Sequence, residues 1–232
     1  MPVDKYKMGS AATADSMSNY NSMIFNVRDL GLIDYVSAYE IQKQCVEDVL
    51  KGKDQCLLLC EHPAVLTLGR LATLNNILCS SSEIEKRGVQ IINIDRGGEV
   101  TLHSPGQLVI YPIFNLNDLG RDLKQYLYQL EQVAIDLLRE FDIVAGRISG
   151  QRGVWVKEKK IVSMGIGVKK WIAYHGLAIN VNTDLGLFSM IRPCGLDVHM
   201  TSMEEVLERE VPLSDVKAKV VECFEHILGT IK

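Results

Sequence analysis

The sequence has no long hydrophobic run, no excess of positive charge and no CxxC pair. A bilayer-spanning helix needs about 18–20 consecutive apolar residues, so we expect no membrane partner. Nucleic-acid-binding surfaces are basic, whereas this chain has a formal net charge of −4, which argues against a nucleic-acid partner. Zinc ribbons need paired CxxC motifs, and the isolated Cys60/His62 pair is better interpreted as core packing. We therefore expect no metal ion and no cofactor.

The first 22 residues contain no arginine and no apolar repeat of helical period. A mitochondrial presequence is rich in arginine and poor in acids, whereas this segment carries Asp4 and Asp15. We predict a disordered extension over residues 1–22 and one catalytic domain over residues 23–232, because no internal repeat or Pro/Gly-rich linker divides the rest. The expected compartment is the cytoplasm, or the mitochondrion if the source is eukaryotic.

Apolar periodicity predicts more strands than helices, without strict alternation between them. This pattern favours one α+β domain with a mixed, largely antiparallel sheet and flanking helices. Pro112 is expected at a sheet edge or a bulge, Glu158-Lys159 as a hairpin turn, and Ser202 and Ser214 as N-caps. The predicted strands cover 23–31, 55–60, 65–70, 89–94, 108–114, 143–148, 153–157, 160–169 and 174–182, and the helices 34–51, 82–88, 121–141, 203–209 and the segment after Ser214.

Cys194 differs from most of the other cysteines because it lies in a loop sequence, Arg-Pro-Cys-Gly. Proline fixes φ and glycine permits tight turns, so this thiol is expected on a rigid loop and not on an apolar stripe. Such a thiol can act as a nucleophile if a base or cation lies nearby. The alternative is an inert thiol, which is the commoner role of a single cysteine.

Lys160 is the candidate partner for that thiol. In a strand over 160–169 it shares one face with Val162, Met164, Ile166 and Val168, and it is the charged member at the end of that apolar face. Burial there favours the neutral amine, which can act as a base. The alternative is a lysine that reaches past the strand end into water.

The stretch RGGEVTLHSPGQLVIYP, residues 96–112, puts a glycine-rich segment directly before an apolar strand. Glycines let backbone N–H groups approach a ligand without interference from Cβ atoms. A tight turn is the simpler interpretation, and neither GxGxxG nor GxxxxGK[ST] is present, which disfavours a dinucleotide or P-loop site. His103 and His175 both lie beside glycines, where they are either structural hydrogen-bonding residues or part of a site wall.

Four segments together resemble the lipoyl(octanoyl) transferase family, the octanoyl-carrier-protein:protein N-octanoyltransferases. These segments are RGGEVTLHSPGQLVIYP at 96–112, GVWV at 153–156 with KIVSMGIGV at 160–168, YHGLAINVNTDL at 174–185, and PCG at 193–195. The resemblance extends in order over about residues 23–228. It implies a catalytic core of the biotin and lipoate protein ligase type and a cysteine–lysine dyad of Cys194 and Lys160. The acyl pocket that it implies comprises Arg96, Gly97, Gly98, Glu99, Val100, Thr101, Leu102, His103, Ser163, Met164, Gly165, Gly176, Leu177 and Ala178.

The resemblance also implies the reaction and its partners. Octanoyl-acyl carrier protein is the expected donor, and lysines in the lipoyl domains of 2-oxoacid dehydrogenases and in the glycine cleavage H protein are the expected acceptors. Three positions depart from the family's usual residues: Glu99 stands for glutamine, Leu102 for an aromatic residue and Ser104 for glycine. Lys169, Lys170 and Arg192 are candidates for a basic surface that docks an acidic carrier.

Other activities are compatible with the same residues. The first alternative is an ATP-dependent lipoate-protein ligase on the same fold, which would not need Cys194. A cysteine hydrolase that pairs Cys194 with His103 or His175 and a non-catalytic binding module for acylated carrier proteins are further alternatives. They differ in whether an acyl-enzyme forms and whether an acceptor protein is needed.

Overall fold

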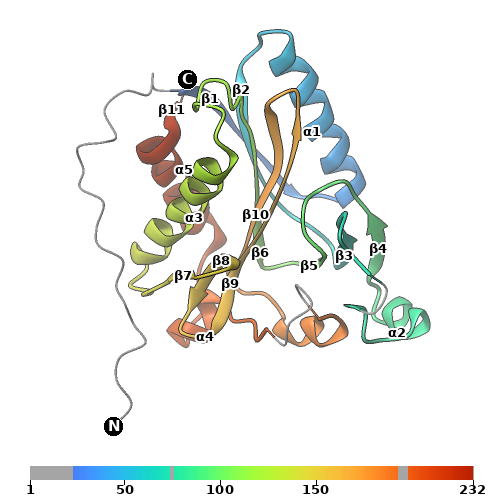
Figure 1. The fold of residues 1–232 in the computed structure, drawn as a ribbon. Coiled ribbons are helices and arrows are strands. Elements are labelled where there is room, and N and C mark those ends of the chain that lie inside the picture. The colour runs from blue at the N-terminus through green and yellow to red at the C-terminus, as the bar shows by residue number, and fades with distance from the viewer. Residues whose placement is uncertain (1–22, 74–75, 193–197, 232) are drawn as a thin grey trace.

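The computed structural model describes residues 23–73, 76–192 and 198–231. The predicted extension over 1–22 and the predicted nucleophile Cys194 therefore lie outside the described residues. An eight-stranded sheet forms the centre of the molecule (Figure 1). Its strands follow the order β11 (Gly229–Ile231), β1 (Met23–Leu32), β2 (Gln55–Glu61), β6 (Gln107–Ile113), β10 (Ile172–Asn180), β9 (Lys159–Lys169), β8 (Gln151–Val156) and β7 (Gly146–Ile148).

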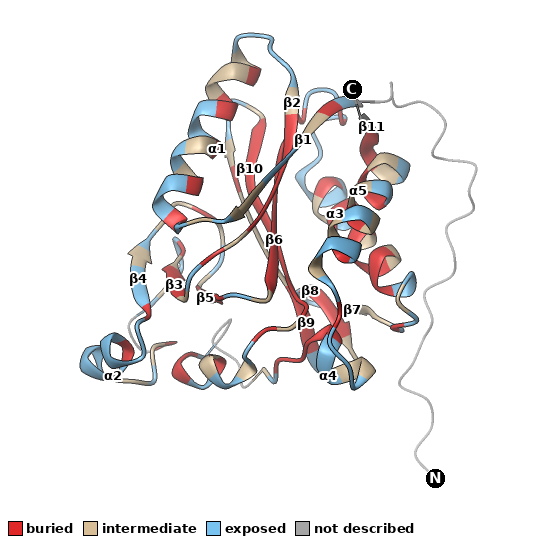
Figure 2. Cartoon of the chain, turned by 180° about the vertical axis from the view of Figure 1, so that it is seen from behind, coloured by how far each residue is buried: buried red, intermediate tan, exposed pale blue. Residues whose placement is uncertain are grey.

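Helices cover both faces of this sheet (Figures 1 and 2). Helix α1 (Tyr35–Leu50) lies on one face, and α3 (Leu123–Arg139) and α5 (Leu213–Leu228) lie on the other. The position of β2 explains why its sequence is continuously apolar. Leu57 and Leu59 belong to the core that includes α3 and α5, while Leu58 packs with residues of α1. Successive side chains point to opposite faces, so a strand covered on both sides needs apolar residues throughout.

A second, three-stranded sheet lies at one end of the first (Figure 1). Its strands follow the order β4 (Gln90–Asn93), β3 (Val65–Leu68) and β5 (Val100–His103), and α2 (Ser81–Lys86) precedes β4. The 3₁₀ helix η3 (Leu185–Met190) contributes Phe188 and Met190 to the core beneath this small sheet. The sequence predicts β3 and β4, but β5 is hidden in the segment interpreted as a glycine-rich loop.

The α+β class and the mixed, largely antiparallel sheet are confirmed. β1 pairs in parallel with β2 and with β11, and the other ladders of the main sheet are antiparallel. None of the helices in the described ranges is both long and apolar enough to cross a membrane.

Several local predictions need correction. The β8–β9 turn consists of Lys157 and Glu158, one residue earlier than predicted, because Val156 pairs with Lys159. Ser202 does cap α4 (Met203–Leu207), where its Oγ accepts from the Glu205 N–H at 3.1 Å. Ser214 does not cap α5: the N-cap is Pro212, and no side chain accepts a bond there.

Pro112 does not lie on an edge strand, because β6 runs between β2 and β10. The continuous β6–β10 pairing stops at Ile110 and Leu177, just before the proline. His175 lies two residues before Leu177 on β10. It has a φ of 57°, and its N–H donates to Gln42 on α1 at 2.8 Å. The pairing irregularity accommodates the donor that proline lacks.

Candidate active site

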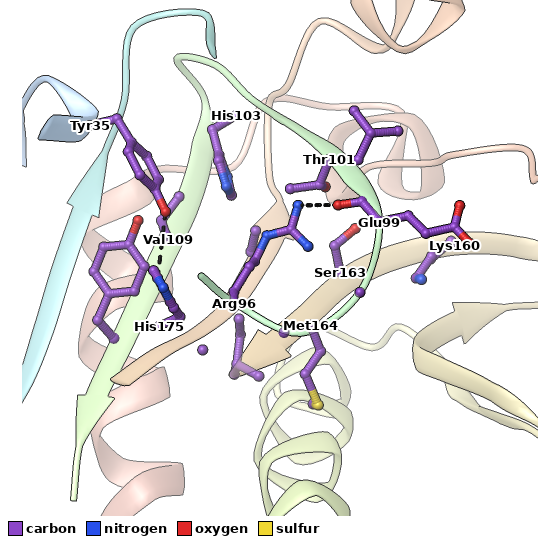
Figure 3. Close-up of a pocket in the computed structure, with 17 residues that line it drawn as sticks. Tyr35, Arg96, Glu99, Thr101, His103, Val109, Lys160, Ser163, Met164 and His175 are labelled. Carbon is purple, nitrogen blue, oxygen red and sulfur yellow. Dashed lines mark hydrogen bonds between the residues drawn. The ribbon is translucent and has the colours of Figure 1, made fainter. Parts of the chain in front are cut away.

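A cleft lies between the glycine-rich segment and the β9–β10 ladder (Figure 3). Strands β5, β6, β9 and β10 and the start of α1 all contribute to its wall. The lining residues are Tyr35, Arg96, Gly98, Glu99, Val100, Thr101, His103, Val109, Tyr111, Lys160, Ser163, Met164, Gly165, His175, Gly176, Leu177 and Ala178.

The glycine-rich segment is held against β9 and the residues after β3 by its backbone and by Arg96. The Gly97 N–H donates to the Ile166 carbonyl at 3.0 Å, and a Cβ on Gly165 would lie 2.9 Å from the Gly97 carbonyl oxygen. Buried Arg96 donates from Nη2 to the carbonyls of Thr67 and Glu99, each at 2.9 Å. Gly165 therefore has no side chain because two backbones lie in contact there.

Lys160 enters the cleft wall from the start of β9 and is only 4% exposed. Its Nζ lies 5.3 Å from the centroid of the Trp155 ring, a cation–π distance. Its aliphatic stem passes Gly153, where a Cβ would lie 2.7 Å from Lys160 Cε. The predicted alternation therefore places Lys160 in the protein interior, and the alternative of a lysine reaching into water is wrong.

A chain of hydrogen bonds connects His103 with the backbone beside Lys160. His103 Nδ1 lies 2.7 Å from Gln107 Oε1, and Gln107 Nε2 donates to Asn180 Oδ1 at 2.9 Å. Asn180 Nδ2 in turn donates to the Thr201 carbonyl, and the Thr201 N–H donates to the Lys160 carbonyl, both at 2.9 Å. Since Gln107 accepts through its oxygen, His103 carries its proton on Nδ1. Complete burial lowers the pKa of His103 to about 3, so its ring is neutral.

His175 is fixed in an uncommon left-handed conformation. Its Nε2 lies 3.1 Å from Asp95 Oδ1, and its ring stacks on Tyr39 with centroids 5.4 Å apart. The hydrogen bond from His175 is the main factor that holds the Asp95 pKa below its ordinary value. Burial lowers the pKa of His175, partly offset by Asp95. A non-glycine residue keeps a positive φ only where surrounding contacts hold it in place, and the contacts with Asp95 and Tyr39 hold His175.

Two tyrosines that line the cleft, Tyr35 and Tyr111, and the buried His62 that contacts both rings were not predicted as site residues. Tyr35, the first residue of α1, stacks on His103 with centroids 5.9 Å apart, and its hydroxyl lies 3.5 Å from His175 Nδ1. The Tyr111 hydroxyl donates to His62 Nε2 at 2.7 Å, because His62 Nδ1 faces the Ile33 carbonyl. The sequence signal at Tyr35 is its position directly after the helix N-cap Asp34, and this position does not identify a residue of a cleft. Tyr111 lies in the apolar run of β6, and His62 was interpreted with Cys60 as core packing, so neither sequence context indicates a site.

Twelve of the fourteen residues predicted for the acyl pocket line this cleft together with Lys160. The other two predicted residues lie outside the cleft lining. Gly97 borders a second opening, and the buried side chain of Leu102 packs in the core of the small sheet. Of the departures from the family, Glu99 accepts from Asn76 Nδ2 at 2.5 Å, and Ser104 is buried in the following turn.

A second, more apolar opening meets the cleft at Lys160, Met164 and Gly165 and is bordered by Trp155 and Val198. Val198 is the first described residue after the segment that holds Cys194. The next residue, His199, accepts from the Lys160 N–H at 2.8 Å through its carbonyl.

The three cations proposed for carrier docking are not brought together. Lys169 lies nine residues beyond Lys160 on the same strand, roughly 30 Å away at strand rise. Its Nζ pairs with Glu47 of α1 at 2.6 Å, and Lys170 follows it in the β9–β10 turn. Arg192 instead lies next to the Cys194 segment, where its N–H donates to the Asn76 carbonyl at 2.8 Å.

Comparison with known proteins gives consistent results. A family model described as the lipoyl protein ligase A/B catalytic domain matches residues 34–225. The octanoyltransferase of Solibacter usitatus is 48% identical over 178 residues, which cover 76% of this chain and 81% of that protein. The octanoyltransferase of Syntrophotalea carbinolica is 41% identical over 206 residues, which cover 88% of this chain and 94% of that protein.

Solved structures with the same fold are more distant in sequence. A bipartite lipoate protein ligase from Thermoplasma acidophilum superposes with a TM-score of 0.69 at 16% identity, covering 90% of this chain and 85% of that one. The biotin protein ligase of Aquifex aeolicus, in complex with biotin and ATP, gives a TM-score of 0.54 at 17% identity, covering 88% and 70% of the two chains. These similarities confirm the predicted ligase-type core.

Proposed function

Because the chain belongs to the octanoyltransferase family within the lipoyl protein ligase A/B catalytic domains, we propose that it uses octanoyl-acyl carrier protein as its donor and a lysine of a lipoyl domain as its acceptor. The protein is an acyltransferase that transfers octanoyl groups in lipoate biosynthesis. The donor, the acceptor and the Cys194–Lys160 dyad are the parts that we infer. The observation that carries the inference is the burial of Lys160 in the wall of a cleft lined by the family's motif residues.

In the proposed mechanism, the Cys194 thiol gives its proton to Lys160, and the resulting thiolate attacks the carbonyl carbon of the octanoyl thioester. The bond between that carbon and the carrier's sulfur breaks, and the departing thiolate takes a proton from Lys160. The amine of the acceptor lysine then attacks the Cys194 thioester and gives a proton to Lys160, while the carbon–sulfur bond to Cys194 breaks. The products are an octanoyl amide and the Cys194 thiolate, which regains its thiol proton from Lys160. The thioester is already activated, so no ATP is consumed.

The described neighbours of Cys194 support this assignment. Cys194 follows Arg192 by two residues and precedes Val198 by four, so covalent geometry keeps its Cα within about 14 Å of Val198. Val198 and Lys160 border the same opening. The Lys160 N–H and C=O pair with His199 and Thr201, so the chain that follows Val198 is held at the start of β9.

Intact-mass spectrometry with octanoyl carrier protein tests the dyad. The wild-type enzyme is expected to gain one octanoyl group, and Cys194→Ala is expected to gain none, whereas Cys79→Ala, which removes a half-buried thiol elsewhere, is expected to behave as wild type. Lys160→Ala is expected to lower acylation about 10²–10⁴-fold, the usual contribution of a general acid–base group. Lys159→Ala, which removes the exposed neighbouring charge, is the matched control. Wild-type turnover in Cys194→Ala would refute the mechanism.

The same assay separates the alternatives. An ATP-dependent ligase requires magnesium and ATP with free octanoate or lipoate, and it keeps its activity in Cys194→Ala. A hydrolase releases octanoate without a lipoyl domain, and a binding module forms no covalent adduct. Two structural observations bear on the hydrolase: His103 Nδ1 is occupied by Gln107, and His175 is held by Asp95. The cytoplasmic location stays a prediction.

A further inference from the structure

The cleft has two chemically different ends. Along the β9–β10 ladder the lining passes from Lys160 to Ser163 opposite Ala178, then to Gly165 opposite Gly176. The next residue of β10 is His175, which marks the far end together with Tyr35 (Figure 3). The reactive amine and the Tyr35 ring therefore lie at opposite ends of a channel (Figure 3). Its middle is lined by small residues of the β9–β10 ladder and by the longer side chains of Arg96 and Met164.

The far end is closed by rings that contact one another. Tyr35 is 3% exposed and forms a triangle of contacting rings with two histidines: its centroid lies 5.2 Å from His62 and 5.9 Å from His103, and the two histidine centroids lie 5.7 Å apart. The Tyr35 hydroxyl lies within hydrogen-bonding distance of His175 Nδ1, and Tyr111 is tied to His62. These contacts leave the Tyr35 ring little freedom to move aside for a longer ligand.

This end wall also suits the end of a hydrocarbon chain. Burial lowers the pKa values of His62, His103 and His175, so the wall is uncharged near neutral pH although it contains three histidines. Its polar atoms bond to partners behind the wall, namely Ile33, Gln107 and Asp95. Aromatic rings such as those of this wall contact apolar groups favourably.

We propose that Tyr35 sets the acyl-chain length of this enzyme: its ring closes the channel, so that a chain whose carbonyl lies near Lys160 ends against it. Among the rings of the wall, Tyr35 is the one that comes from α1, whereas the others come from strands or strand ends. Its side chain can therefore be replaced by a smaller one without disturbing the pairing of strands. A smaller residue at position 35 opens space toward His62 and His103. The inference rests on the proposed function, because it assumes that the chain occupies this cleft.

The test is a series of hexanoyl, octanoyl, decanoyl and dodecanoyl carrier proteins, with kcat/KM measured for transfer to a lipoyl domain. Tyr35→Ala is expected to raise the decanoyl-to-octanoyl ratio of kcat/KM about tenfold, the effect of burying two further methylene groups. Tyr35→Phe keeps the ring and is expected to keep the wild-type ratio. Tyr128→Ala removes an exposed tyrosine ring from α3, outside the cleft, and controls for the loss of a ring as such.

Tyr35→Leu is measured in parallel, because it preserves apolar bulk in the core if the alanine variant fails to fold, and it is expected to shift the ratio in the same direction. An unchanged chain-length profile in either folded variant, with octanoyl transfer intact in the wild type, overturns the role of Tyr35 alone. A wild-type enzyme that transfers no acyl group from any carrier overturns the proposed function instead. An equal shift in Tyr35→Phe would assign chain length to the hydroxyl and also refute the proposal.

Discussion

Replacement of Gly153 by alanine tests how closely β8 packs against Lys160. Gly153 has a φ of +103°, and a Cβ there would lie 2.3 Å from the Val162 carbonyl oxygen and 2.7 Å from Lys160 Cε. The backbone oxygen cannot move without disturbing the β8–β9 ladder, while the lysine stem can move only by carrying Nζ with it. The substitution should therefore impair both stability and catalysis.

The magnitude follows from two costs. An alanine held at this φ stores about 1–3 kcal/mol of backbone strain, and forcing a methyl group into a filled space costs about 1–3 kcal/mol more. The free energy of unfolding should fall by about 2–6 kcal/mol. Turnover in the folded variant should fall on the order of 100-fold, because a displacement of about 1 Å in a catalytic group has that effect.

Gly150→Ala is the matched control from the same hairpin. Gly150 also has a positive φ, +78°, but nothing lies within 4 Å of the position that a Cβ would occupy there. Its substitution should cost only the left-handed backbone term, about 1–2 kcal/mol. Urea denaturation and single-turnover acylation by octanoyl carrier protein measure the two effects. Equal losses of stability in both variants, with acylation unchanged in Gly153→Ala, would show that the close approach to Lys160 does not matter.

Two further predictions concern buried charge. In the unfolded state His103 is protonated below about pH 6.5, whereas in the folded state its pKa is about 3. The free energy of unfolding should therefore fall as the pH drops through this window, by at most about 1.4 kcal/mol per pH unit. Urea denaturation of His103→Gln at several pH values should show a shallower dependence of that free energy on pH. Glu131 is a buried carboxylate that accepts from Arg147 Nε at 3.0 Å and from the Gly153 N–H at 3.2 Å. Glu131→Ala should lower the free energy of unfolding by about 3–5 kcal/mol. Glu140 is exposed, so Glu140→Ala should change it by less than about 0.5 kcal/mol. An equal loss of stability in the two variants would show that the buried contacts of Glu131 do not stabilise the fold.

Most secondary-structure elements could be predicted from local patterns. The stripe of α3 and the continuous apolar letters of β2 reflect burial on one and on two faces, and periodicity reports burial directly. Strand β11 and strand β5 were missed for physical reasons. β11 is three residues long and forms only by pairing with β1, and β5 follows glycines that resemble a loop although it pairs with β3.

The sequence by itself determined the fold class, the segments that carry the family motifs and the side of β9 on which Lys160 lies, because each of these depends on residue types at short spacing. The tertiary structure decided which residues meet. Tyr35, His103 and His175 come from a helix and two strands that are distant in the chain, and their neutral, closed wall exists only because packing removes water from all three. Contacts between such distant residues depend on strand order and register, which no local pattern encodes.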